Sequence, residues 1–332
     1  MSAVNFDPFG PALSPVVLAS LVGLTWLYIR GASRPRLVRE RVGPVRHYLF
    51  AVGVLLLVLA FDTPVAPLGQ QLFAAHQIQH VMIRLLGPML VTLAYPWPVI
   101  RAGLPHRWRH RLNDLGNRKS VSFLGRTLSL LGVSFVLFIA SLYLWQVPML
   151  HTAALAFPPL GLLAHLSMVL TGILFFAVVF DRRGTNQGAT QSLRVLALVG
   201  VILSNILLGS LTTMKTIVLY TGYDNTGRPW GFAPLVDETF GGYTIWVPSS
   251  MIIIVAIILV FNGWNAAEER HWESRHTWTG SNAAALEFPE TAYELRLKVT
   301  EQNRRMGQTL ALSAAAMFAV VMITAITLIY AL

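Results

Sequence analysis

Two histidines, His76 and His80, are four residues apart within an apolar stretch of the chain. Imidazoles with this spacing lie on one face of a helix, close enough to share a metal ion. Titratable groups are costly inside a bilayer, so they usually have a function there. The pair therefore predicts a metal site, provided that other ligands reach the same membrane depth. A pair that only forms hydrogen bonds within a helical bundle is the alternative.

The composition predicts an all-α, polytopic integral membrane bundle. The 332 residues are 55% hydrophobic and 12% charged, whereas soluble domains carry about 25% charged residues. A spanning helix needs about 20 mostly apolar residues. We expect a single transmembrane domain over residues 1–332 with eight spans, at Leu13–Ile29, Tyr48–Phe61, Gln71–Ala94, Thr127–Trp145, Leu160–Phe180, Val195–Thr213, Tyr243–Phe261 and Thr309–Tyr330.

Positive charge predicts the orientation of these spans. Of the 25 Lys and Arg residues, 22 fall in alternate loops, which the positive-inside rule assigns to the cytoplasm. Both termini are then expected on the outer, periplasmic side. The basic loops are interpreted as topology signals that also contact membrane lipid, and not as a nucleic-acid site. Residues 1–15 carry no Lys or Arg, so the first apolar run is expected to remain as a helix rather than act as a signal peptide.

The longest cytoplasmic loop is expected at residues 262–308. Its latter part, Pro289 to Arg305, is rich in Glu, Leu and Arg and predicts a helix near the membrane surface, because proline suits a first helical turn. The segment 309–330 would follow as an additional C-terminal transmembrane helix.

This topology gathers several possible ligands on the outer side. The candidate metal-binding residues there are His76, His80, His165, His151, Asp62 and Asp237. The other five histidines fall in or beside cytoplasmic loops. Because the chain has no cysteine, thiolate sites, disulfides and cysteine nucleophiles are excluded. Imidazole and thioether ligands without thiolate suit copper, and zinc would accept the same imidazoles plus a carboxylate.

Several of these residues also have plain structural interpretations. Met149 and Met168, near His151 and His165, are interpreted as ordinary packing. Asp62 and Asp237 are either interfacial charges or partners that orient the ligands. Arg84 continues the stripe of His76 and His80, and an arginine at this depth needs a partner or a water-filled crevice.

Haem is the rival use for membrane histidines. Axial histidines approach a haem from opposite sides of the ring, so His76 and His80, on one face, cannot sandwich it. A His80–His165 haem stays open. No second pair of this kind occurs on the cytoplasmic side, which argues against electron transfer across the bilayer.

From about Phe50 to Glu269 the chain resembles the CtaG-like family of bacterial cytochrome c oxidase assembly factors. Three stretches carry the resemblance: 75–82 (AHQIQHVM) followed by Gly87-Pro88, 151–172 with Ala164-His165-Leu166, and 233–242 (APLVDETFGG) followed by 245–248 (IWVP). The chain departs from the family pattern at four places. These are Glu238 for an amide, Gly161 for a histidine, Arg84 at an apolar position, and the segment 309–330 beyond a seven-span core.

The resemblance implies a non-enzymatic assembly factor of the bacterial inner membrane that matures a haem–copper oxidase by handling copper on its outer face. Its expected partners are cytochrome c oxidase subunits and a periplasmic copper carrier. On this interpretation His76, His80 and His165 bind the metal directly, His151 is a fourth ligand, and Asp62 or Asp237 supports them. A copper permease is the alternative, together with the haem-binding redox protein; a permease would need polar groups that continue to the cytoplasmic side.

Overall fold

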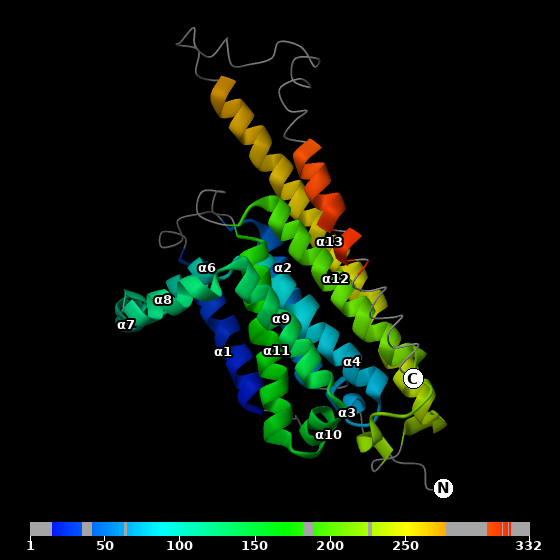
Figure 1. Cartoon of the computed structure of the whole chain (residues 1–332). Coiled ribbons are helices and arrows are strands. Elements are labelled where there is room, and N and C mark those ends of the chain that lie inside the picture. Colours follow the sequence, from blue (N-terminus) through cyan, green and yellow to red (C-terminus); the bar gives the residue numbers. More distant parts are fainter. Residues whose placement is uncertain are drawn as a thin grey trace. The chain divides into compact units, whose positions relative to one another are not determined.

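The computed structural model describes residues 15–34, 42–62, 65–117, 119–181, 189–224, 228–276, 304–313, 315–317 and 319, without the side chains of Asn117 and 267–276. The described residues form helices and no strands (Figure 1). The chain divides into two compact units, residues 1–256 and residues 257–332. All of the candidate site residues belong to the first unit.

The helices follow one another with short connections. In chain order they are α1 (Pro15–Ala32), α2 (Pro44–Phe61), α3 (Val65–Gly69), α4 (Phe73–Val81), the π-helix η2 (Met82–Leu86), α5 (Gly87–Leu93), α6 (Trp97–Gly103), α7 (His106–Asn117), α8 (Lys119–Leu128), α9 (Leu131–Gln146), α10 (Pro148–Ala156), α11 (Pro158–Val179), α12 (Gln191–Met214), the short turns η3 (Thr221–Asp224) and η4 (Pro229–Gly231), and α13 (Pro234–His276).

The all-helical, multi-pass membrane class is confirmed. Among the described residues, five helices are long and apolar enough to cross a membrane, and up to seven if each of two bent helix pairs is one span. The predicted count of eight is not reached in this part of the chain. The expected surface helix at Pro289–Arg305 and the expected eighth span lie mostly outside the described residues.

Proline decides where several helices begin. The seventh span was expected to start at Tyr243, but α13 starts at Pro234 and carries Asp237 in its first turn. The predicted short second span starts earlier, at Pro44, and has 18 residues. His151, expected in a loop, lies in α10, which begins at Pro148. A proline at the first position supplies a helical φ where no N–H bond is needed, so each of these starts is favourable.

The helices that carry the site are fixed by close packing. α11 packs against α9 and α5, with Phe138 and Phe175 stacked at 4.6 Å between ring centres. Gly172 of α11 lies against η2, where an added Cβ would be 2.4 Å from the carbonyl oxygen of Arg84. Only a glycine permits this approach. The continuous α4–η2–α5 segment is thereby held against α11.

Candidate metal centre

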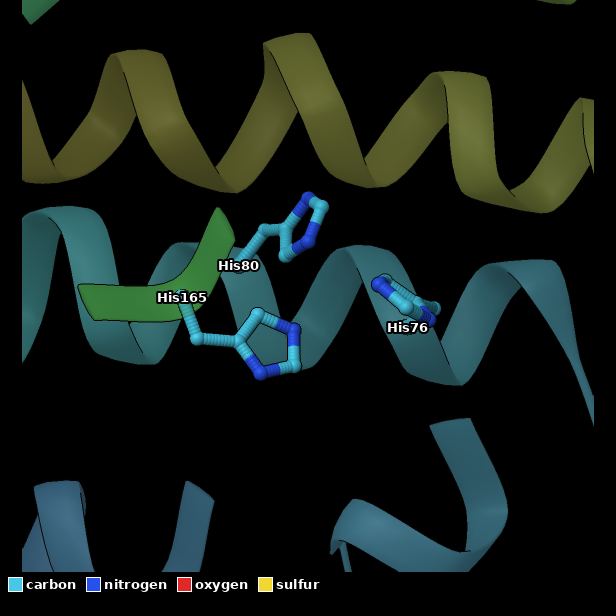
Figure 2. A group of neighbouring side chains, drawn as sticks. All are labelled: His76, His80 and His165. Carbon is cyan, nitrogen blue, oxygen red and sulfur yellow. The ribbon is translucent and has the colours of Figure 1, made fainter. Parts of the chain in front are cut away.

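Three buried histidines from two helices lie together in the first unit. His76 and His80 come from α4, and His165 reaches them from α11 (Figure 2). One ring nitrogen of each lies within 4.8 Å of those of the other two. The ring centres are 4.5 Å apart for His76 and His80, and 5.5 Å and 5.6 Å from His165 to each. The structure thus brings together three of the six predicted site residues.

The local contacts leave nitrogens free to bind an ion. His76 Nδ1 lies 2.9 Å from the Gly69 carbonyl oxygen, to which an Nδ1–H donates. Its Nε2 is therefore available to bind a metal ion. His80 Nδ1 is buried without a hydrogen-bond partner. The three histidines, with His151 and Gly161, line a small cavity of about 20 Å³, close to the size that one water requires. These features fit a single metal ion.

His151 lies beside the three histidines, but both of its ring nitrogens have hydrogen-bond partners. Its ring centre is 4.7 Å from that of His76. Nδ1 lies 3.1 Å from the Trp145 carbonyl oxygen and Nε2 lies 2.7 Å from the Tyr223 hydroxyl. Burial lowers the pKa of His151 and raises the pKa of Tyr223 well beyond their usual values. A neutral imidazole therefore donates to Trp145 and accepts from a neutral Tyr223.

Asp237 binds the start of the helix that carries His76 and His80, and it does not reach the histidines themselves. Its carboxylate accepts hydrogen bonds from the backbone N–H groups of Phe73 at 2.9 Å and Ala74 at 3.0 Å, and from Arg228 Nε at 3.2 Å. The first N–H groups of a helix have no partner within it, and a carboxylate there is favourable. Asp237 thus caps α4 one turn before His76 and lies outside the three-histidine cluster.

The neighbouring Glu238 organises the loop that holds the tyrosines. It accepts hydrogen bonds from the backbone N–H groups of Leu219 at 3.0 Å and Tyr220 at 2.8 Å, and it pairs with Lys215. Tyr220 in turn stacks on Phe73, with ring centres 4.2 Å apart. The two acidic residues that precede the expected seventh span are therefore structural supports of the site.

The remaining sequence candidates lie outside the cluster. Asp62 ends α2, where its backbone N–H donates to Val58 and its carbonyl accepts from Ala66. Met168 is fully buried in an apolar cluster with Met82 and other residues. Met149 is 83% exposed. The placement of Met168 agrees with the expected packing role, whereas Met149 is too exposed for one.

Arg84 is buried inside the bundle at the π-helix. Its Nη2 donates to Asn205 Oδ1 at 3.3 Å, its guanidinium carbon is 4.3 Å from the centre of the Phe138 ring, and its Nε has no partner. Among the described residues no carboxylate forms an ion pair with Arg84. The partner that an arginine at this depth needs is here an amide and an aromatic ring.

The residues that orient the histidines were not predicted from the sequence. Gly69, Trp145 and Tyr223 contact His76 or His151, but no spacing relates them to the histidine motif. Gln77 and Gln146, which are hydrogen-bonded to each other, were not predicted to lie near the site either. A glutamine buried beside the histidine pair was the one available signal, because buried amides need partners.

The arrangement can bind a cation that prefers nitrogen ligands. Three imidazoles within reach of one point, with no carboxylate or thiolate among them, match copper or zinc rather than calcium or magnesium. Ligands that share one ion at about 2.0 Å lie roughly 3.5 Å apart, so modest side-chain rotations would complete the site.

The family model described as cytochrome c oxidase caa3 assembly factor (Caa3_CtaG) matches residues 26–267. Uncharacterized proteins of Mycobacterium bovis and Mycobacterium tuberculosis are each 24% identical over 310 residues, covering 91% of this chain and 45% of theirs. An uncharacterized protein of Mycobacterium leprae is 22% identical over 291 residues, covering 80% and 42%. The chain thus spans less than half the length of these relatives. No solved structure matches the chain significantly.

Proposed function

The chain belongs to the family of cytochrome c oxidase caa3 assembly factors, and we propose that it serves oxidase assembly by holding copper at its three-histidine cluster. The observation that carries the proposal is the convergence of His76, His80 and His165 within 4.8 Å. Copper is the cargo here, and the protein passes it to an oxidase subunit. A periplasmic carrier would supply it. No bond is made or broken in a substrate, so the role is not enzymatic.

The ligand set favours a transferable ion. Thiolates hold copper and zinc tightly, whereas neutral imidazoles form a site without charge of its own. The nearest buried cation, Arg84, follows His80 by one helical turn and lacks a carboxylate partner among the described residues. Its charge opposes a bound cation. Both features weaken binding, as delivery requires.

The charge pattern of the loops supports the outer face as the place of the site. His76 lies in the first helical turns after Phe73, at the end of the segment remote from the basic residues of α7 and α8. By the positive-inside rule the basic end faces the cytoplasm. The histidine end then faces the periplasm of a bacterial inner membrane.

The rival functions have less support. A cavity of about 20 Å³ beside the histidines cannot hold a porphyrin, which disfavours the haem-binding redox protein. A copper permease needs ligands that continue through the membrane, and the next polar side chain along the segment is the cationic Arg84.

Copper loading of the purified protein tests the site. After Cu(I) loading and removal of loose metal, elemental analysis should find about one copper per wild-type chain and much less in His76→Ala/His80→Ala. The exposed pair His106 and His110 has the same spacing, with ring centres 4.2 Å apart, and provides the matched comparison. If the His106→Ala/His110→Ala variant loses the copper and the His76→Ala/His80→Ala variant keeps it, the proposed site is wrong.

The biological role is tested separately by gene deletion. Deletion should leave haem–copper oxidase subunits present but inactive, with partial rescue by added copper. A deletion strain with normal oxidase activity would contradict the assembly function even if the protein binds copper. A haem absorption band that scales with protein would instead favour the redox alternative.

A further inference from the structure

A second polar site lies at the other end of the segment that carries the histidines. Residues after α5 line an open pocket of about 530 Å³, among them Trp97, Arg101, His106, Arg109, His110 and Asn113. The four that belong to α7 have the spacing i, i+3, i+4 and i+7, so they form one face of that helix. The part of the Phe73–Leu93 helix that follows His76 separates the histidine from this pocket by roughly 25 Å.

The pocket is positively charged and has an unused donor. Arg101 Nη2 donates to Asn113 Oδ1 at 2.6 Å, which links α6 to α7. Arg109 Nε is buried without a hydrogen-bond partner. None of the described residues that line the pocket is acidic. A guanidinium pair without counter-charge is suited to a phosphate group, which it can bind through paired N–H donors.

The helices around the pocket turn away from the spanning direction. The chain bends by 74° between Phe73–Leu93 and Trp97–Gly103, and by 73° between Lys119–Leu128 and Leu131–Gln146. At the first bend Tyr95 adopts a left-handed φ of 50°. Figure 1 shows α7 and α8 extending sideways from the first unit's helices. A helix at such an angle to the spans lies close to the membrane plane.

Apolar side chains of these helices are exposed beside the pocket. Trp108, Leu112 and Leu115 share a second face of α7, and Phe123 of α8 is 71% exposed. Trp97, at the pocket itself, is 57% exposed. Basic helices with an exposed apolar face lie in the membrane interface, and tryptophan prefers the headgroup level. Apolar surface next to Arg101 and Arg109 is covered more favourably by acyl chains than by water.

We propose that this pocket binds the phosphate group of an anionic phospholipid. Arg101 and Arg109 donate to the phosphate, Trp97 lies at the headgroup, and the exposed apolar face of α7 contacts the acyl region. The free Arg109 Nε and the lack of an acidic lining residue are explained by this ligand. The lipid would hold α6 and α7 in place against the membrane surface.

The test measures binding of phosphatidylglycerol to the full chain in detergent micelles, with phosphatidylcholine and inorganic phosphate as parallel ligands. Wild type should bind phosphatidylglycerol at least about tenfold more tightly than either, because the anionic headgroup and acyl chains act together. Tight binding of inorganic phosphate equal to that of the lipid would overturn the lipid assignment. Binding of phosphatidylcholine as tight as that of phosphatidylglycerol would overturn the claim that the arginines select an anionic headgroup.

Two pairs of substitutions on neighbouring faces locate the site. Arg101→Gln/Arg109→Gln should weaken phosphatidylglycerol binding by about tenfold or more. Arg107→Gln/Arg111→Gln removes the same charge from exposed α7 residues that do not line the pocket and should change binding by less than about threefold. Equal losses of phosphatidylglycerol affinity in both double variants would mean that the lipid is attracted to the charge of α7 in general, and would refute binding at the pocket. Arg101→Lys/Arg109→Lys, which keeps the charge, should bind phosphatidylglycerol clearly more tightly than Arg101→Gln/Arg109→Gln and so separates a lost contact from a lost fold.

Discussion

Asp237 and Phe73 are 164 residues apart in the chain and are joined by a hydrogen bond of 2.9 Å, from the backbone N–H of Phe73 to the Asp237 carboxylate. This bond connects the first turn of α13 to the first turn of α4. Gly241, one turn further along α13, permits the contact, because an added Cβ there would be 2.2 Å from the Phe73 ring. The position of the histidine helix therefore depends on α13.

Asp237→Ala should destabilise the protein and displace the histidine helix. It removes the cap of α4 and leaves Arg228 without this carboxylate, so we expect a loss of about 2 kcal/mol in unfolding free energy and weaker copper binding. Thermal unfolding in detergent and copper titration measure the two effects. Asp224→Ala is the matched control, because Asp224 also pairs with Arg228 but its side chain is 45% exposed. Equal effects of both substitutions would contradict the capping role.

His165→Ala and His151→Ala should differ in their effect on copper affinity. His165 belongs to the three-histidine cluster, whereas both nitrogens of His151 have hydrogen-bond partners. Loss of a ligand should exceed the roughly 10- to 100-fold effect typical of a residue that only orients ligands, and His151→Ala should stay within that range. Competition with a Cu(I) chelator of known affinity gives the values. A larger effect at His151 would restore it as the fourth ligand that the sequence predicted.

Arg84→Gln should strengthen copper binding. For unit charges about 8 Å apart at an effective dielectric constant near 20, removing the repulsion is worth about 2 kcal/mol, or more than tenfold in affinity. Asn205→Ala removes the hydrogen bond to Arg84 but keeps the charge, so it should leave the affinity almost unchanged. The same chelator competition measures both variants. Unchanged affinity in Arg84→Gln would show that the guanidinium does not act on the bound ion.

Gly161→Ala should lower stability, although alanine favours helices. Gly161 lines the histidine cavity, and an added Cβ would be 2.7 Å from the Ala154 carbonyl oxygen, so α10 would have to shift. We expect a net loss of about 1–2 kcal/mol. Gly132→Ala, in α9, meets no atom within 4 Å and should instead gain about 0.5–1 kcal/mol. Thermal unfolding of both variants measures the difference, and a stabilised Gly161→Ala would mean that α10 adapts freely. A histidine at this position would meet the same Ala154 carbonyl oxygen, so α10 would have to shift for it as well.

Local features of the chain were enough to predict the helical membrane class, the segments that contain the spans, and the shared face of His76 and His80. These features follow from local hydropathy and from the 3.6-residue period of a helix. They also placed His165 and Asp237 near the same end of the bundle, without indicating what these residues contact.

Which of these groups meet depends on how the helices pack. Packing of α11 against the α4–η2–α5 segment brings His165 to the histidine pair, whereas Tyr223 engages His151 and the backbone of α4 engages Asp237. Arg84 is held by Asn205 and Phe138, from two other helices. Such partners depend on interhelical packing between distant segments, for which a single sequence carries no periodic signal.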